Sequence, residues 1–226
     1  MKLPSEVPVM TLPHATLFPQ ALLPLYIFEP RYRQMLAETL QAGRMFSVAM
    51  QKPGRSRETP SPIAGLGLIR VSVGHNDGTS HLILQGIARV QLCETVRYKP
   101  YRIQRIQPLA SPPCKEVVID ALLAKVRELL EERVDLGINF PFPSPPKVKS
   151  KNIEPPPGFS PKDVLQYLDK LTDPEQVADL VSCAVLPGPV ERQTILETVH
   201  LESRLKILIH FLLAEIKNQR NNKSKS

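Results

Sequence analysis

The hydrophobic periodicity of this 226-residue chain changes once, near the Ser-Pro-Pro sequence at residues 111–113. Before that point, apolar residues alternate or form short runs bounded by proline and glycine, which is typical of β-strands. After it, apolar residues recur every three or four positions, which is typical of amphipathic helices. The sequence therefore predicts a strand-rich part over residues 1–113, a helical part over 114–217 and a disordered polar tail at 218–226.

The strand-rich part combines extended segments with one helix. Pro30 suits the first position of that helix, and Gly43 suits a left-handed cap at its end. Asp77-Gly78 between two β-branched, apolar runs predicts a tight hairpin. Strands are predicted at 7–12, 22–28, 45–50, 63–73, 81–92 and 97–109. These elements favour a small antiparallel β-barrel, closed or nearly closed, with one inserted helix.

The helical part is interrupted by an unusually proline-rich segment. Residues 137–158 contain seven prolines in 22 positions, a composition that cannot bury enough apolar area to order itself, and we expect an exposed loop. Helices are predicted from about residues 116, 160, 173, 190 and 201. The second part is therefore expected to be a four- or five-helix bundle, and the fold class to be α+β.

The net charge of +7 belongs entirely to the first part. Residues 1–113 hold 13 Lys and Arg against 6 Asp and Glu, whereas residues 114–226 hold 16 of each kind. The chain has no run of about 18 apolar residues, so no membrane span is predicted. Its first residues lack the apolar core of a secretory signal, and we expect a cytoplasmic protein. The three cysteines are far apart, which favours buried free thiols over disulfides.

Motifs for chemistry are missing from the sequence. No GxxxxGK[ST] loop is present to bind a nucleotide, and the five histidines do not have metal-ligand spacing. Ser160 and Lys162 have the pattern of a helix cap and not of a catalytic Ser/Lys pair. The chain is therefore predicted not to be an enzyme and to need neither a metal nor a cofactor.

Three groups of segments carry a family resemblance, and together they span residues 6–216. They are Val7–Leu12, Leu17–Pro19, Leu23–Leu25 and Phe28–Tyr32; then Gly65–Val73, Asp77-Gly78 and Gln85–Val90; then Asp173–Asp179, Glu191–Glu197 and Arg204-Leu205. In order and spacing they resemble the N-terminal, substrate-binding domain of the Lon protease. The resemblance implies a PUA-like barrel followed by a helical bundle. It also implies a module that handles protein substrates, here as a free-standing domain without the ATPase and protease parts.

An aromatic and basic cluster surrounds the start of the predicted first helix. Tyr26, Phe28 and Tyr32 could pack between helix and barrel, with the arginines exposed to solvent. Alternatively, these side chains line a groove for extended peptides, in which aromatic residues supply contact area. The candidate polypeptide-binding residues are Tyr26, Phe28, Arg31, Tyr32 and Gln34. The predicted function is non-catalytic binding of a polypeptide, either an unfolded or degron-bearing protein or a protein partner, with an adaptor role towards a protease.

A second candidate surface lies on the last predicted strand. Tyr98, Lys99, Tyr101, Arg102 and Arg105 interleave aromatic and basic side chains. Such interleaving can stack on bases and contact phosphates, so RNA is the alternative partner. An ordinary solvated strand face explains the same pattern without any ligand.

Overall fold

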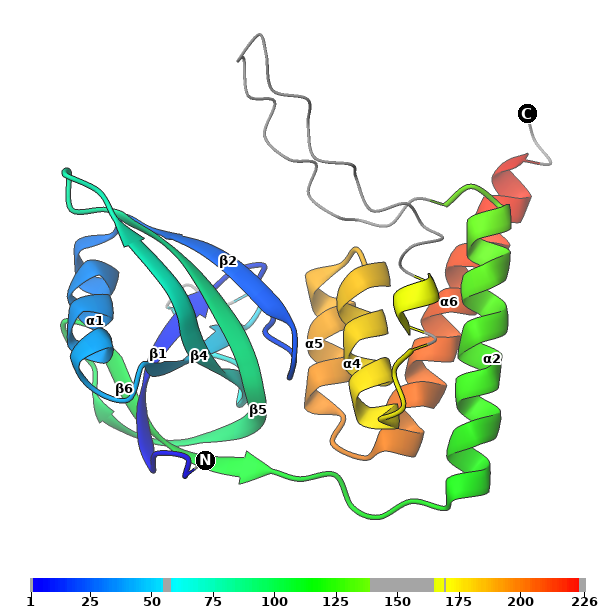
Figure 1. Cartoon of the computed structure of the whole chain (residues 1–226), viewed down its shortest axis with the longest axis horizontal. Helices are drawn as coiled ribbons and strands as arrows, with labels where there is room; N and C mark the ends of the chain where they lie inside the picture. The colour runs from blue at the N-terminus through cyan, green and yellow to red at the C-terminus, as the bar shows by residue number, and fades with distance from the viewer. Residues whose placement is uncertain (1, 55–57, 139–164, 169, 224–226) are drawn as a thin grey trace, which may run out of the picture. The chain divides into compact units, whose positions relative to one another are not determined.

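The computed structural model describes residues 2–54, 58–138, 165–168 and 170–223. The chain forms two compact units, shown in Figure 1. The barrel unit comprises residues 1–112 and 188–199, and the helical unit comprises residues 113–187 and 200–226. The chain therefore leaves the barrel unit after Pro112, returns to it once, and ends in the helical unit.

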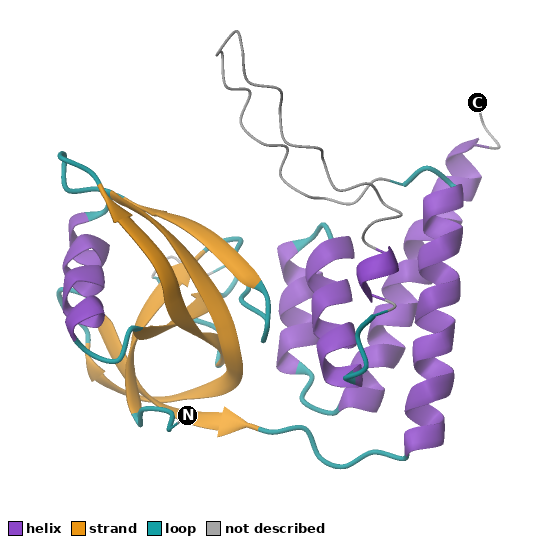
Figure 2. Cartoon of the chain, in the orientation of Figure 1, coloured by secondary structure: helices purple, strands orange, loops and turns teal. Residues whose placement is uncertain are grey.

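Six strands build the barrel unit, and Figure 2 shows them in orange. They are β1 (Glu6–Leu12), β2 (Leu22–Ile27), β3 (Met45–Met50), β4 (Ile63–Gly74), β5 (Ser80–Arg97) and β6 (Arg102–Leu109). Their order is β2-β5-β4-β3-β1-β6, and a further pairing of β5 with β6 closes the barrel. The predicted α+β class is confirmed. The barrel is not wholly antiparallel, because β1 and β3 run parallel; a parallel pair needs a long connection, which here includes a helix.

Helix α1 (Pro30–Gln41) is that inserted helix, and it begins at Pro30 as predicted. Its buried face carries Tyr32, Met35 and Leu36, which pack into one core with side chains from β3, β4 and β5. The predicted left-handed cap at Gly43 is wrong. Arg44 adopts the positive φ of 57° instead, because the chain closes its turn through the Arg44 N–H, which donates to the Thr39 carbonyl at 3.0 Å.

The last two strands meet in a turn that the sequence pattern did not reveal. The prediction of one strand over residues 97–109 is wrong, since β5 continues to Arg97 and β6 begins only at Arg102. Arg97 pairs with Ile103 across the two antiparallel strands. The chain must therefore reverse direction over residues 98–101, where Pro100 has no N–H to donate to a ladder.

The helical unit contains α2 (Glu116–Asp135), α4 (Pro174–Val185) and α6 (Leu201–Lys223). Asp173 caps α4 by accepting a hydrogen bond from the Glu175 N–H at 3.0 Å. Helix α6 runs beyond residue 217, where a disordered tail was expected. Ion pairing explains part of this extension, because Arg220 meets Glu132 of α2 at 2.5 Å. Among the described helices, none combines the length and the hydropathy that a membrane span requires.

Only the first two residues of the proline-rich segment lie within the described part of the chain. Residue 137 adopts a positive φ of 70° just after α2, but most of the segment predicted as a loop, and the helix start predicted at Ser160, lie outside the described residues. Residues 165–168 are helical.

Helix α5 (Pro189–Glu197) belongs to the barrel unit, although its sequence suggested a bundle helix. The Gln193 side-chain amide donates to the Ile63 carbonyl at 2.9 Å. Arg89 of β5, which is buried, donates from Nε to the Leu196 carbonyl at 3.2 Å. These bonds, with buried Ile195 and Leu196, fix α5 against the barrel strands.

Candidate functional site

Strands β2, β5 and β4 present an apolar surface to solvent as well as to the core. Side chains two residues apart share one face of a strand, and the register aligns them across strands. Pro24, Ile83 and Val71 form one row, while Tyr26, His81 and Val73 form the next. We use the name outer face for Leu22, Pro24, Tyr26, Phe28, Val71, Val73, His81 and Ile83.

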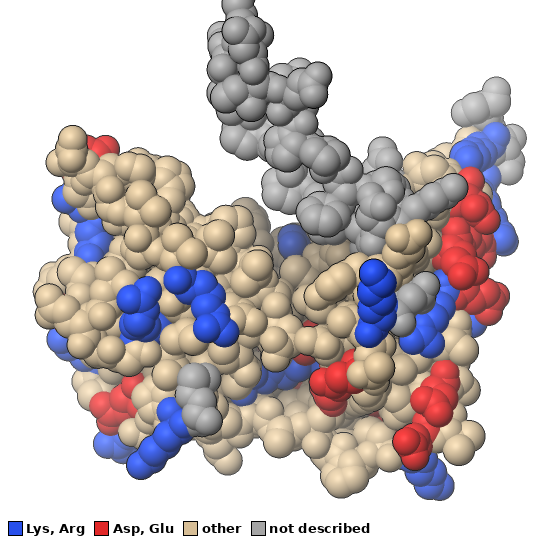
Figure 3. Space-filling view, viewed as in Figure 1, with Lys and Arg blue, Asp and Glu red and all other residues tan. Residues whose placement is uncertain are grey.

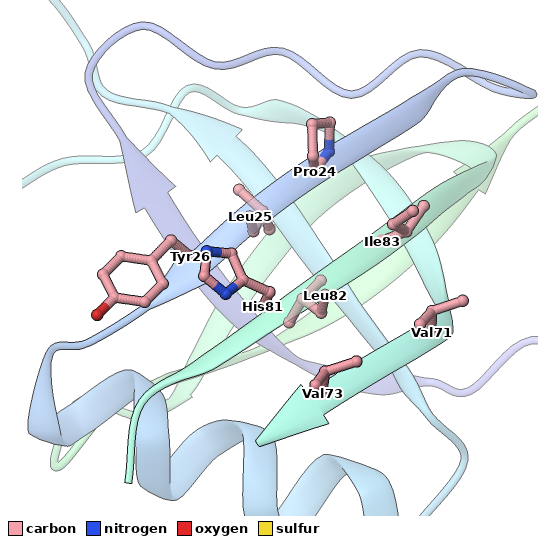
Figure 4. Close-up of a pocket in the computed structure, with 8 residues that line it drawn as sticks. All are labelled: Pro24, Leu25, Tyr26, Val71, Val73, His81, Leu82 and Ile83. Atoms are coloured by element: carbon pink, nitrogen blue, oxygen red, sulfur yellow. The ribbon is translucent and has the colours of Figure 1, made fainter. Parts of the chain in front are cut away.

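The large apolar side chains of the outer face are 37–61% exposed. A shallow hollow of about 410 Å³ lies over β2, β4 and β5 and is lined almost wholly by apolar atoms. Figure 4 shows Tyr26 beside His81, with Ile83 and the two valines on the neighbouring strands. Leu82 and Leu84, on the opposite side of β5, are buried in the barrel core. Both faces of β5 are therefore apolar here, whereas a sheet with one solvated face normally alternates with polar residues.

The aromatic residues at one end of the outer face contact one another through their rings. The Tyr26 ring stacks on Phe28 with centroids 5.8 Å apart and lies 4.7 Å from the His81 ring. His75 meets His81 edge-on, and their Nε2 and Nδ1 atoms are 2.7 Å apart. Side chains that already hold one another lose less conformational entropy when a ligand binds. This row is therefore a preorganised apolar contact surface.

Polar groups border the outer face at both ends. At one end, the Arg70 Nε donates to Gln85 at 2.5 Å, and Gln85 donates to Gln20 at 3.3 Å. At the hairpin end, Asp77 accepts hydrogen bonds from the hydroxyl and the N–H of Thr79, and these bonds lower the pKa of its carboxyl group. A polar rim around an apolar centre is the usual anatomy of a protein interaction surface.

The predicted polypeptide-binding residues divide between surface and core. Tyr26 and Phe28 lie on the outer face. Tyr32 is only 4% exposed, and its hydroxyl bonds the N–H and carbonyl of Thr11 at 3.2 and 3.3 Å. Burial, with the nearby Glu58 carboxylate, raises the pKa of Tyr32 to about 12, so the hydroxyl stays protonated. Tyr32 therefore anchors α1 in the core and is not available to a ligand.

The two polar candidates on α1 also have partners within the barrel unit. Arg31 pairs with Glu29 at 2.9 Å and with Glu58 at 2.5 Å. Gln34 donates to Glu38 at 2.9 Å on the exposed side of the helix. The structure does not bring either side chain onto the outer face.

Six residues of the outer face were not predicted from the sequence: Leu22, Pro24, Val71, Val73, His81 and Ile83. A signal exists for the apolar ones, because residues 22–28, 68–73 and 82–84 contain apolar residues at adjacent positions, and adjacent positions point to opposite faces of a strand. Such runs in a barrel strand indicate that one apolar side chain of each pair is left outside the core.

The five residues of the second candidate surface do not form one free basic face. Tyr101 is buried, with its hydroxyl bonded to Glu38, and Arg105 pairs with Glu6 at 3.2 Å and Glu94 at 2.9 Å. Arg102 donates to the Glu58 carbonyl at 3.1 Å, and its guanidinium lies 5.0 Å from the Tyr98 ring. Lys99 lies in the turn before β6. On the face in Figure 3, lysine and arginine side chains of the barrel unit form separate groups.

Acidic and thiol side chains do not gather into a metal site in the described parts of the chain. There, no group of three or more His, Cys, Asp or Glu residues is placed to hold an ion. The three cysteines are free thiols, with Cys93 exposed and the other two partly buried.

Comparison with solved structures identifies the same fold elsewhere. The N-terminal domain of Lon protease from the Mycobacterium avium complex has a TM-score of 0.68 at 16% identity, with 92% of this chain and 97% of that chain covered. The Lon N-terminal domain protein from Xanthomonas campestris has a TM-score of 0.55 at 16% identity, with 91% and 97% covered. At this level of identity the likeness shows the fold.

Comparison of sequences identifies the family. The Lon protease of Dictyoglomus thermophilum is 22% identical over 217 residues, and that of Trichlorobacter lovleyi is 25% identical over 202 residues. These matches cover 95% and 87% of this chain but only 25% and 22% of the relatives, so the chain spans about a quarter of their length. Residues 6–214 match the family model of the ATP-dependent protease La (LON) substrate-binding domain. The chain belongs to this family of substrate-binding domains.

Proposed function

We propose that this chain is a non-catalytic module that binds polypeptide segments through the outer face of β2, β5 and β4. The observation that carries the proposal is the set of large apolar side chains held in solvent in two cross-strand rows. None of the eight residues of the outer face is Asp, Glu, Lys or Arg. Exposed apolar surface with a polar rim is characteristic of sites that bind other proteins.

The chemistry of the outer face selects a class of ligand. Burial of apolar area is the main favourable term, about 25 cal/mol for each Å² removed from water. An unfolded polypeptide exposes the aromatic and aliphatic side chains that a folded protein hides. The ligand we propose is therefore an unfolded or degron-bearing segment. We extend the proposal to an adaptor role, in which the chain holds such a segment for a protease.

A double variant of the outer face tests this function. We expect Tyr26→Ser combined with Val73→Ser to weaken binding of a reduced, carboxymethylated protein roughly 10- to 30-fold, because central aromatic and apolar contacts dominate interface energies. Fluorescence anisotropy with a labelled, permanently unfolded α-lactalbumin gives the dissociation constant. Tyr98→Ser is the matched control, since Tyr98 is 68% exposed but lies in the turn before β6.

Two results would contradict the proposal. One is a double variant that binds as tightly as the unchanged chain. The other is an equal loss in Tyr98→Ser, which would move the binding surface to the β5–β6 turn. Titration with single-stranded RNA at rising salt distinguishes the alternative partner, because phosphate contacts make affinity fall steeply with ionic strength.

A further inference from the structure

The outer half of β4 has a strand on one side only. Strand β3 pairs with β4 as far as Leu68, which lies opposite Met45. Strand β5 continues to pair with β4 as far as Gly74. Within the described chain, residues 69–74 therefore border no strand on their other side, and this segment forms a sheet edge beside the outer face.

The pairing register shows which backbone groups point out of this edge. The Gly86 N–H donates to the Ala21 carbonyl at 2.9 Å, so residue 86 directs its backbone groups away from β4. Because this direction alternates along a strand, Ile83 and His81 direct their groups towards β4. Val71 and Val73, which pair with Ile83 and His81, therefore use their backbone groups for hydrogen bonds to β5. The residues between and after the valines, Ser72 and Gly74, therefore direct N–H and C=O groups out of the edge.

The chain itself fills the first position of this edge. The Ile69 N–H donates to the Arg44 carbonyl at 2.8 Å, and the Arg44 Nε donates back to the Ile69 carbonyl at 3.3 Å. The next outward positions, Ser72 and Gly74, have no such partner among the described residues. They leave two N–H donors and two carbonyl acceptors at strand spacing.

Strands β2, β5 and β4 form a three-stranded region, and its two edges differ in how strongly they oppose the addition of another strand. Strand β2 carries Pro24 at its centre, which removes a donor and so opposes the addition of another strand. The β4 edge contains no proline, and from Val71 to Gly74 it contains no charged residue. Natural sheets usually block such an edge, because unpaired strand groups recruit another chain.

Basic side chains lie at both ends of the β4 edge. Arg70 precedes Val71, and the Arg33 guanidinium lies where a side chain at residue 78 would begin. Asp77 is the acidic residue of the hairpin turn. Because its carboxylate interacts electrostatically with Arg33, the basic excess of the edge lies at Arg70. The Arg70 end therefore complements a segment that has an acidic side chain next to its apolar ones.

We infer that an extended polypeptide segment with an acidic end adds to the β4 edge as a further strand, bonded to Ser72 and Gly74. This inference rests on the proposed function and specifies how the ligand's backbone is held. Side chains on one face of the added strand lie beside Val71 and Val73 and extend the outer face. Backbone bonds would supply affinity independent of sequence, while the outer face would select apolar side chains.

Backbone methylation of a peptide tests strand addition directly. The probe is a labelled nine-residue peptide of alternating valine and threonine with glutamate at both ends. Two methylated forms carry N-methyl groups on the odd or on the even central residues. In an added strand, only one of these sets directs its N–H groups towards β4. We therefore expect one methylated form to bind at least 10-fold more weakly than the unmethylated peptide, and the affinity of the other to change less than 3-fold.

Variants of the protein provide a second measurement. Ser72→Pro removes an N–H that the sheet does not use, and we expect it to weaken binding of the unmethylated peptide at least 5-fold. Ser72→Ala is the matched control and should bind normally, with unfolding midpoints showing that both variants are folded. A version of the peptide with lysine at both ends should bind more weakly than the glutamate version.

The outcomes separate this inference from the proposed function. If both methylated forms bind equally and Ser72→Pro has no effect, strand addition is wrong. The proposed function then still stands if the Tyr26 and Val73 double variant loses binding of unfolded protein. If that variant keeps full binding, the proposed function itself is wrong.

Discussion

Gly65→Ala is expected to prevent stable folding of the barrel unit. A β-carbon at residue 65 would lie 2.0 Å from the Leu17 carbonyl oxygen and 2.7 Å from the Leu17 β-carbon. The obstruction is backbone in the segment between β1 and β2, so no flexible side chain can move aside. We expect the free energy of unfolding to fall by more than about 4 kcal/mol, measured by urea denaturation, or the protein to be insoluble.

The matched control for this substitution is Gly43→Ala. A β-carbon there meets nothing closer than the Met45 side chain at 4.0 Å. We expect the free energy of unfolding to change by no more than about 0.5 kcal/mol. If Gly65→Ala were as mild as Gly43→Ala, the close approach of residues 17 and 65 would be wrong.

Asp179→Ala is expected to destabilise the helical unit by about 3–5 kcal/mol. The Arg204 guanidinium is 2.7 Å from Asp179 of α4, and the two side chains are 1% and 2% exposed. Glu175 approaches the same guanidinium at 2.7 Å but is one-third exposed. Removing Asp179 leaves a buried positive charge with weaker compensation, and desolvation makes that costly. Urea denaturation monitored by far-ultraviolet circular dichroism measures the change.

Glu202→Ala is the control for ion pairing in general. Glu202 meets Lys206 at 2.6 Å on the same helix as Arg204, but both side chains are exposed. Exposed pairs contribute about 0–1 kcal/mol because water and salt screen them. Equal, small losses in both variants would show that Arg204 is not buried as described.

Local chemistry made much of the fold predictable. Pro30 and Pro174 fix φ at helix starts, and Asp77-Gly78 supplies the positive φ of a hairpin turn, which Gly78 adopts at 80°. Each of these signals acts within a few residues. The change from strand to helix periodicity has the same origin, since it reflects which side of each element is buried.

The placement of α5 and the burial of Arg204 depend on contacts between residues far apart in the sequence, so they were not predicted. Helix α5 has the pattern of any short amphipathic helix, and its contacts with the barrel strands, including the bonds between Gln193 and Ile63 and between Arg89 and Leu196, place it in the barrel unit. Arg204 lies on a helix face otherwise filled by leucines and Ile216, and its burial depends on Asp179. Spacing along the chain identifies neither the strands that α5 contacts nor the acidic partner of Arg204.

The outer face was predictable in part. Tyr26 and Phe28 occupy alternate positions of an extended segment and point the same way, whereas Tyr32 follows the change to helical period at Pro30 and turns into the core. The contribution of Val71 and Val73 depends on β4 lying beside β5 in the observed register. That register follows from the hairpin and from the shift between Ile69 and Val71, which the sequence pattern did not locate.

Site-specific photocrosslinking tests most directly whether the outer face binds polypeptide. p-Benzoylphenylalanine replaces Val73 in one version and Val117 of α2 in another, and each is irradiated with labelled, carboxymethylated α-lactalbumin. Val117 is the more exposed valine, at 81% against 52%, but it lies outside the outer face. We predict crosslinks from position 73 that excess unlabelled protein suppresses, and few from position 117. Equal crosslinking at both positions, or crosslinking at position 117 alone, would contradict binding at the outer face.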